Sequence, residues 1–246
     1  AFSCSHRKQA SVHSITKFVK KSYAGPLLKK EIKAINLVIK NKKEPVTCII
    51  GGSKISTKIN VINNLIKNVN NIVIVGAMAN NFLIFKGFVV GKSLIEKGTK
   101  ETISKIYVEA KKYNCNILIP EDCSVSNDFK SIGKIKITDS IDKNEIILDI
   151  GPKTIKNINN IIDQSKTVLW NGPAGYIENK NFSHGTLAIA NKISESTNKK
   201  SLISIIGGGD TISAINKSKD KFIFTHLSTA GGAFLEFLEG KDLPGL

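Results

Sequence analysis

The chain has few of the residues that mark a nucleic-acid-binding protein. Arg7 is the single arginine among 36 basic residues, and aromatic residues make up 7% of the 246 positions. Proteins that read nucleic acids combine arginines, which contact bases and phosphates in pairs of hydrogen bonds, with interleaved aromatics. The formal net charge of +16 therefore indicates a lysine-rich solvated surface, and we expect no nucleic-acid partner. A basic nucleic-acid-binding module is the alternative, and steeply salt-dependent binding would reveal it.

Paired cysteines, zinc-site spacings and long apolar runs are also missing. The four cysteines, Cys4, Cys48, Cys115 and Cys123, form no CxxC pair. Cys48 lies within the apolar residues 46–50, where a buried free thiol is ordinary. We therefore expect a reduced, cytoplasmic compartment and no membrane partner.

What the chain does contain is a repeated order of apolar run, glycine turn and helical pattern. Such runs, each followed by a turn that contains glycine, occupy residues 46–50, 72–75, 167–170 and 202–206. Short buried strands that alternate with helices predict an α/β fold, a doubly wound parallel sheet of Rossmann-like type with helices on both faces. Less regular β structure is predicted for residues 130–137 and 145–150, and a short strand for residues 222–224.

The glycine turns predict where a ligand binds and what charge it carries. In an open α/β sheet, ligands bind at the carboxyl ends of the strands. Glycine at these ends lets the backbone come close to a ligand, and free amides at a helix N-terminus favour anions. At least three such turns on one edge of the sheet predict a phosphorylated ligand.

The first of these turns places two lysines at the start of a predicted helix. Residues 51–58 read Gly-Gly-Ser-Lys-Ile-Ser-Thr-Lys, and an amphipathic helix is predicted over residues 54–67. On that helix Lys54 and Lys58 would share one face. Two ammonium groups there repel each other and oppose the helix dipole, so we expect anionic oxygens between them. The alternative is a pair of exposed lysines in a lysine-rich protein.

Three further turns offer polar groups at strand ends. In the turn at residues 207–211, Asp210 is suited to Mg²⁺ and Thr211 to phosphate, although Asp210 could instead cap a helix. The turn at residues 171–178 carries Glu178, which could accept hydrogen bonds from ribose hydroxyls, although an isolated glutamate is usually a surface residue. A third anion-ready turn spans residues 228–232, where ordinary helix capping is the alternative.

Two common nucleotide motifs are not matched. Residues 87–93 approach a Walker A loop but have three residues between the glycines where the phosphate cradle needs four. No GxGxxG is present, which weakens the alternative of another α/β nucleotide-dependent enzyme such as an NAD-dependent oxidoreductase.

Taken in order, these segments resemble the phosphoglycerate kinase family over essentially the whole chain. The matching segments read AFSCSHR, GGSKISTK, VGAMANNFL, LWNGPAGYIE, IIGGGDT and STAGGAFLEFLEGKDLPG. The resemblance implies that residues 1–24 are a remnant of an N-terminal phosphoglycerate-binding α/β domain. It implies a long interdomain helix in residues 25–42 and a C-terminal nucleotide-binding domain in residues 43–246.

The resemblance also implies an activity. The family transfers a phosphoryl group reversibly between 1,3-bisphosphoglycerate and ADP, giving 3-phosphoglycerate and ATP with Mg²⁺, in glycolysis and gluconeogenesis. It implies a monomer whose partners are these small molecules. Because most of the phosphoglycerate-binding domain is missing from residues 1–246, we expect them to bind nucleotide but to turn over weakly or not at all.

Roles for individual residues follow from the same resemblance. Lys54 is similar to the lysine that follows the transferred phosphoryl group, and Gly231 and Gly232 lie in the loop whose amides face that group. Arg7 matches an arginine that contacts phosphoglycerate, and Asp210 resembles the Mg²⁺ ligand. The nucleotide-binding positions are Lys58, Gly76, Ala77, Asn171, Pro173, Glu178, Gly208, Gly209, Asp210 and Thr211. Among these, Lys58 resembles the phosphate-binding lysine, and Gly76 and Ala77 the lining of the adenine pocket. Departures from the family pattern occur at Pro26, Thr57 and Ala230.

Overall fold

The main sheet of the molecule is built from parallel strands that range from residue 46 to residue 228. The computed structural model describes residues 1–218 and 220–246. The strands of this sheet are β1 (Val46–Ile50), β2 (Asn71–Ile74), β3 (Asn116–Leu118), β7 (Thr167–Asn171), β8 (Ile203–Gly207) and β9 (His226–Ser228). They lie in the order β3-β2-β1-β7-β8-β9 and every neighbouring pair is parallel. The order runs outward in both directions from β1 and β7, which confirms the predicted doubly wound fold.

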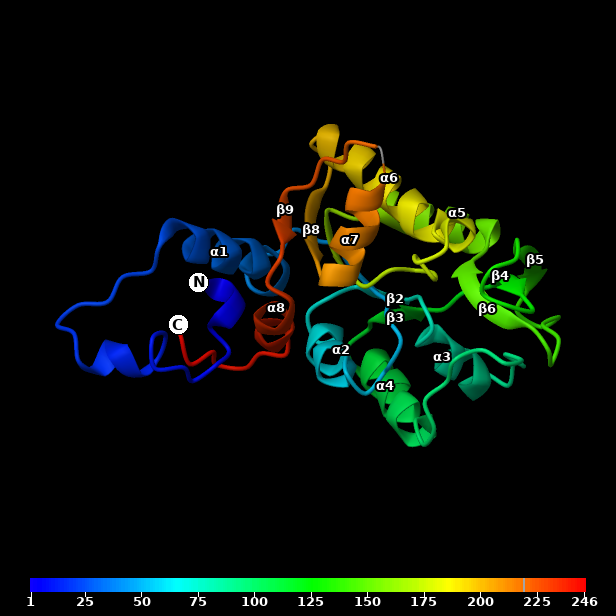
Figure 1. The fold of residues 1–246 in the computed structure, drawn as a ribbon, viewed down its shortest axis with the longest axis horizontal. Coiled ribbons are helices and arrows are strands. Elements are labelled where there is room, and N and C mark those ends of the chain that lie inside the picture. The colour runs from blue at the N-terminus through cyan, green and yellow to red at the C-terminus, as the bar shows by residue number, and fades with distance from the viewer. Residues whose placement is uncertain (219) are drawn as a thin grey trace.

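Helices cover both faces of this sheet, as Figure 1 shows. One face carries α1 (Pro26–Ile39), α2 (Ile59–Ile66), α3 (Ala79–Phe85), α4 (Lys100–Lys112) and α8 (Gly231–Leu238). The opposite face carries α5 (Pro152–Gln164), α6 (His184–Asn198) and α7 (Gly209–Lys217). Side chains of each strand alternate between the two cores: Cys48 and Ile50 of β1 join the first, and Ile49 joins the second.

A second, antiparallel sheet stands beside the main one, at the right of Figure 1. It is formed by β4 (Asp122–Ser126), β5 (Lys134–Ile137) and β6 (Ile146–Ile150) in the order β5-β4-β6. The predicted irregular β region covers β5 and β6. Strand β4 was not predicted. Its residues alternate polar and apolar side chains, which is a strand pattern, but all five are buried, and two apolar residues are a weak indication of a buried strand.

The prediction of a strand at residues 222–224 is wrong. The last strand is β9, which pairs with β8 from His226 onward. Phe222 and Phe224 stack on each other with ring centroids 6.1 Å apart and pack against the core of α5, α6 and α7. Their hydrophobicity therefore reflects packing at the edge of the core rather than a place in the sheet.

The two ends of the chain lie together, away from the main sheet (Figure 1). Residues 1–24 contain the short 3-10 helices η1 (Phe2–Cys4) and η2 (Ser14–Lys17). The backbone amide of Gly245 donates to the carbonyl of Ser5 at 2.8 Å, and His13 Nδ1 lies 2.7 Å from the carbonyl oxygen of Pro244. Helix α1 occupies most of the predicted interdomain segment, and the division into domains stays a prediction.

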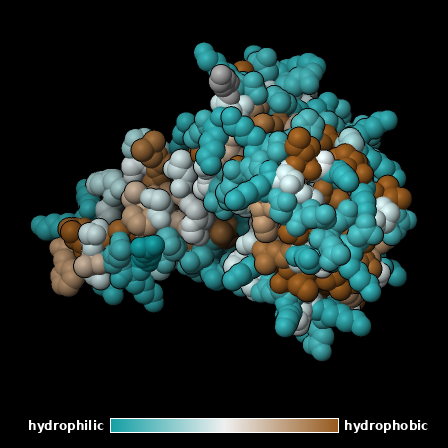
Figure 2. All heavy atoms as spheres, turned by 45° about the vertical axis from the view of Figure 1, so that its right-hand side comes forward, coloured by the Kyte–Doolittle hydropathy of each residue, from teal (hydrophilic) through white to brown (hydrophobic). Residues whose placement is uncertain are grey.

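The surface agrees with the predicted lysine-rich, solvated exterior. Hydrophilic residues cover most of the face drawn in Figure 2, and hydrophobic residues gather over the part of the larger lobe that faces the viewer. Cys48, Cys115 and Cys123 are buried free thiols. Across residues 1–218 and 220–246, no helix has both the length and the hydrophobicity needed to cross a membrane.

Candidate functional site

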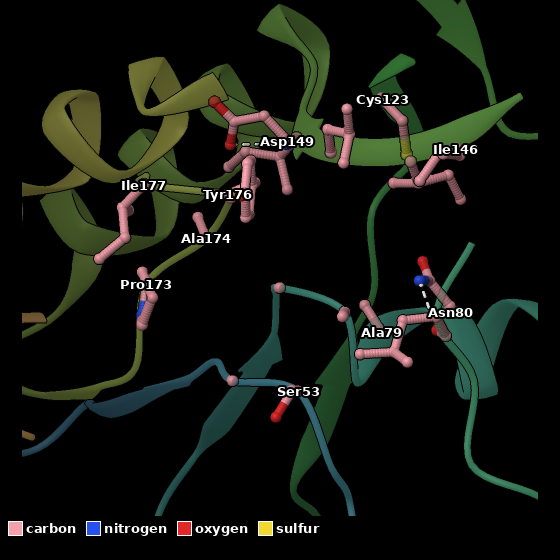
Figure 3. Close-up of a pocket in the computed structure, with 18 of the residues that line it drawn as sticks. Ser53, Ala79, Asn80, Cys123, Ile146, Asp149, Pro173, Ala174, Tyr176 and Ile177 are labelled. Atoms are coloured by element: carbon pink, nitrogen blue, oxygen red, sulfur yellow. Dashed lines mark hydrogen bonds between the residues drawn. The ribbon is translucent and has the colours of Figure 1, made fainter. Parts of the chain in front are cut away.

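A cavity of about 410 Å³ opens at the carboxyl edge of the main sheet, beside the point where the strand order reverses between β1 and β7. Its lining includes the loops that follow β1, β2 and β7, as well as the first turn of α7. Figure 3 shows Ser53 below the cavity, Ala79 and Asn80 on one side, and the segment with Pro173 and Ala174 on the other. Doubly wound sheets bind their ligands at this reversal point.

Hydrogen bonds join the loops around this edge into one assembly. The amide of Gly51, after β1, donates to the carbonyl of Asn171 at 2.9 Å. The amide of Gly76, after β2, donates to the carbonyl of Ala174 at 3.2 Å. The amide of Gly172, after β7, donates to Thr211 Oγ1 of α7 at 2.8 Å. The site is therefore held in shape by its own backbone before any ligand arrives.

The close approach of two of these loops requires glycine. Gly172 has a φ of 103°, a conformation that L side chains rarely adopt. A Cβ on Gly172 would overlap the backbone of Gly51, and a Cβ on Gly51 would overlap the backbone of Gly172 and Pro173. The glycines at residues 51 and 172 are thus fixed by steric contact between the ends of β1 and β7.

Lys58 brings a partly buried positive charge to this junction. Its ammonium donates to the carbonyl of Asn171 at 3.3 Å and to the side-chain Oδ1 of the same residue. Burial lowers the pKa of Lys58 to about 8, although the nearby Asp210 carboxylate acts in the opposite direction. The Nδ2 of Asn171 is buried and has no hydrogen-bond partner among the residues that the structure describes. A desolvated cation and a free donor side by side favour an anionic ligand.

The prediction that Lys54 and Lys58 share a helix face is wrong. Helix α2 begins at Ile59, and Lys58 only caps it. Lys54 lies in the preceding turn, where Thr57 Oγ1 donates to its carbonyl at 2.8 Å and the side chain is exposed. Ser and Thr side chains that bond the local backbone compete with helix formation, which explains why the helix starts late.

The turn after β8 presents a carboxylate to the cavity. Gly208 caps α7 with a φ of 96°, Gly209 begins the helix, and Asp210 is exposed and lines the cavity. No cluster of three His, Cys, Asp or Glu side chains occurs among the described residues. A single carboxylate still fits Mg²⁺, because this ion is commonly held by one or two carboxylates together with substrate phosphates. Asp210 would hold the ion, which would neutralise phosphate charge when bound.

The rest of the cavity is largely apolar and includes residues that the sequence analysis missed. Its walls include Leu83, Phe129, Ile146, Leu148, Tyr176 and Ile177. Asn80 and Asp149 are also part of the lining, and both are almost fully buried. Asp149 accepts hydrogen bonds from two backbone amides, and burial raises its pKa to about 7. Three of these residues, Ile146, Leu148 and Asp149, belong to β6 of the antiparallel sheet, whose position next to the glycine turns is not encoded in any local pattern.

A second group of predicted residues lies at the chain ends. Arg7 Nε donates to His6 Nε2 at 3.4 Å, and a Cβ on Gly232 would lie 2.9 Å from that same nitrogen. Gly231 is the first residue of α8. The fold therefore brings Arg7 and this glycine pair, from opposite ends of the chain, to one place.

The predicted site residues thus fall into two sets, with Lys54 in an exposed turn between β1 and α2. One set lines the cavity: Gly76, Ala77, Pro173, Glu178 and Asp210. Lys58, Asn171 and Thr211 are linked to it through hydrogen bonds, Gly208 lies next to Asn171, and Gly209 begins α7 beside Asp210. The other set is Arg7, Gly231 and Gly232. The role of each residue in ligand binding stays a prediction.

Comparison with known proteins agrees with this architecture. The family model described as phosphoglycerate kinase matches residues 1–241. The chain is 47% identical to a phosphoglycerate kinase of Wolbachia pipientis wMel and 44% identical to one of Bartonella quintana, over all of this chain and 62% of each relative. The solved phosphoglycerate kinase of Coxiella burnetii superposes on it with a TM-score of 0.93 at 38% identity, over 100% of this chain and 62% of that one.

A more distant structure shows the same arrangement. Phosphoglycerate kinase from Pyrococcus horikoshii OT3 gives a TM-score of 0.83 at 28% identity and is covered over 61% of its length. The chain therefore spans about three fifths of the length of the relatives that it matches. The fold, the glycine turns and a family model that covers nearly every residue all agree. The chain therefore belongs to the phosphoglycerate kinase family.

Proposed function

We propose that residues 1–246 bind ADP or ATP with Mg²⁺ in the cavity at the carboxyl edge of the main sheet. The observation that carries this proposal is the convergence of Lys58, Asn171, Gly208 and Asp210 where the strand order reverses. A partly buried ammonium, a free amide donor, a glycine-capped helix start and a carboxylate suited to Mg²⁺ are complementary to a polyphosphate.

The arrangement gives the ligand an orientation. The polyphosphate lies at the Lys58 end, and Asp210 holds the Mg²⁺ ion that accompanies it. The nucleoside enters the apolar cavity, with the base between α3 and the segment that follows β7 and the ribose near Glu178. A largely apolar pocket with a few polar groups at one end suits a planar base joined to a charged tail.

The reaction proposed is phosphoryl transfer between 1,3-bisphosphoglycerate and ADP, giving 3-phosphoglycerate and ATP. Such a transfer needs accurate positioning and positive charge around the moving group more than covalent chemistry by the protein. Lys54 and the amides of Gly231 and Gly232 would supply that charge and those donors, and Arg7 would contact the phosphoglycerate. Transfer from an acyl phosphate to ADP requires no general base.

We further propose that residues 1–246 on their own turn over weakly or not at all, as a monomer in the cytoplasm. Arg7 is the single arginine of the chain, and it lies beside His6, whose ring is next to Gly232. An acid with several negative charges needs more cationic donors than one arginine offers.

Two measurements test the proposal separately. Calorimetric titration of residues 1–246 with ADP and Mg²⁺ should show one saturable site, and titration with 3-phosphoglycerate should show much weaker binding. A coupled assay should detect little or no ATP formation from 1,3-bisphosphoglycerate and ADP. Absence of ADP binding would refute the nucleotide site, whereas full turnover by these residues would refute only the proposal about their activity.

A further inference from the structure

The cavity has one side made of irregular backbone, residues 173–178, which we name the strap. All six of its residues line the cavity, and it forms neither helix nor strand. Contacts with other elements hold it: the amide of Ala174 donates to Thr186 Oγ1 at 2.9 Å, and the amide of Tyr176 donates to the carbonyl of Leu148 at 2.7 Å. The shape of this side of the cavity therefore depends on what lies behind the strap.

Behind the strap lies the carboxylate of Asp149, which belongs to β6. Asp149 Oδ2 accepts from the amide of Gly185 at 2.8 Å, at the start of α6, and Oδ1 accepts from the amide of Ile150 at 2.9 Å. A Cβ on Gly175 or on Gly185 would overlap this carboxylate, so it fills the space between the strap and α6. Figure 3 shows the carboxylate beside Tyr176 and turned away from the middle of the cavity.

We propose that Asp149 is a positioning residue for the nucleoside end of the bound nucleotide. Its carboxylate joins the first turn of α6 to the back of Gly175 and so fixes the strap as one side of the cavity. Asp149 belongs to the cavity lining, but its carboxylate is turned toward the strap and away from the middle of the cavity, so we assign it a role through the strap. This inference rests on the nucleotide site proposed above and assigns one residue the task of shaping it.

The environment of Asp149 supports such a task. The side chain is 2% exposed, and no Lys, Arg or His side chain donates to it among the described residues. Burial raises the pKa of Asp149 to about 7, so that keeping its charge costs free energy in the folded protein. Buried groups with strongly shifted titration at the edge of a cavity are frequent at functional sites.

Asp122 provides a matched comparison within the same small sheet. It is also buried, at 3% exposure, and it also receives helix amides: Lys153 donates to Oδ2 at 2.9 Å and Thr154 to Oδ1 at 2.7 Å, at the start of α5. Asp122 is not part of the cavity lining, and the atoms nearest to a Cβ on Gly175 of the strap come from Asp149 and Phe182. Both aspartates accept hydrogen bonds from backbone amides at the start of a helix, and Asp149 in addition contacts the strap.

The test compares Asp149→Asn with Asp122→Asn on residues 1–246, using two probes at a temperature where both variants are folded. ADP with Mg²⁺ reports on the whole ligand, and tripolyphosphate reports on the phosphate end alone. We expect Asp149→Asn to weaken ADP binding about tenfold, because the side-chain amide has a single acceptor oxygen and cannot accept from both Gly185 and Ile150. Tripolyphosphate binding should change less than about twofold, and Asp122→Asn should leave both affinities at the wild-type value.

Every other outcome opposes the inference. Equal weakening of both probes would make Asp149 a general structural residue, and unchanged ADP affinity would show that the strap does not need it. If Asp149→Asn does not fold, the NMR signal of the Asp149 carboxyl ¹³C in the wild type serves as the test. Its chemical shift should change when ADP is added and should not change when tripolyphosphate is added. If the wild type binds tripolyphosphate but not ADP, both the nucleotide site and the role of Asp149 are overturned. If ADP binds and the carboxyl chemical shift of Asp149 does not change, only the role of Asp149 is overturned.

Discussion

The edge of the main sheet and the junction of the chain ends both gather predicted site residues, but they are built differently. At the sheet edge, Gly51, Gly76 and Gly172 donate backbone hydrogen bonds between loops, and the core elements beneath are fully buried. At the chain ends, Phe18 and Tyr23 are more than 80% exposed, and Arg7 has only its neighbour His6 as a side-chain partner among the described residues. The first region is preorganised, and the second offers few contacts that fix its side chains.

This difference separates two kinds of prediction. Substitutions at the sheet edge should change folding and nucleotide affinity together, because the same bonds support both. Substitutions within residues 6–24 should change local order with little effect on the rest of the fold, because none of these residues is buried, whereas Phe2 belongs to the core beside the main sheet.

The largest effect is expected for Gly172→Ala. The residue has a positive φ and no room for a Cβ, so the free energy of unfolding should fall by roughly 3–5 kcal/mol. Denaturant unfolding can be followed through Trp170, the single tryptophan, which is buried next to the site. Gly231→Ala is the matched control at the chain ends: a Cβ there meets nothing within 4 Å, and the change should stay within about 0.5 kcal/mol. Equal losses in the two variants would contradict the comparison.

Asp149 should impose a pH dependence on stability. Its carboxyl has a pKa raised to about 7 in the folded state, whereas an unfolded chain gives about 4. Between these values the folded state binds a proton that the unfolded state does not, so this group makes stability fall as pH rises from about 4 to 7, by a total on the order of 4 kcal/mol. Asp149→Asn should remove that fall when unfolding is measured across this range. Parallel curves for wild type and variant would show that the carboxyl titrates normally.

Thr211→Val tests the bond that ties α7 to the end of β7. Thr211 is fully buried, and its hydroxyl is the acceptor for the amide of Gly172. Leaving that amide without a partner should cost about 1–3 kcal/mol of unfolding free energy and weaken ADP binding at the same time. Thr57→Val removes a comparable hydroxyl from an exposed turn and should cost about 0.5 kcal/mol. A stable Thr211→Val with normal affinity would show that this tie does not organise the site.

The smallest effect is expected for His13→Ala. The ring of His13 contacts the carbonyl of Pro244 at 2.7 Å in a partly buried position, so its loss should cost about 1 kcal/mol. Hydrogen exchange should speed up around Gly245 and remain unchanged around Gly51 and Gly172. Faster exchange at both places would mean that the two regions are coupled more closely than their contacts indicate.

The sequence was sufficient to predict the architecture, because the alternation of β-branched runs, glycine turns and helical periods is local. The strand from Val46 to Ile50 begins and ends where its apolar run does. Prediction failed where a side-chain bond or long-range pairing decides the structure. The helix expected from residue 54 starts late because Thr57 bonds the carbonyl of Lys54, and β4 is paired with β5 on one side and β6 on the other.

The candidate site was predictable in its charged and glycine residues and not in its apolar surroundings. Lys58, Gly208 and Asp210 lie in turns that can be recognised from the sequence, because each turn contains glycines directly after an apolar run. Asp149 stands in an ordinary hydrophobic strand, and its position behind the strap arises only when β6, α6 and the end of β7 meet. Such a residue has no local sequence pattern because its partners come from three separate segments.

The most direct test of the account compares two lysines four residues apart. ADP with Mg²⁺ is titrated against the wild type, Lys58→Met and Lys54→Met. Loss of the buried ammonium at Lys58 should weaken binding by about 30- to 100-fold, whereas loss of the exposed Lys54 should weaken it by less than about threefold. Equal effects of the two substitutions, or a Lys58→Met variant that binds ADP as the wild type does, would contradict a nucleotide site at the reversal of the strand order.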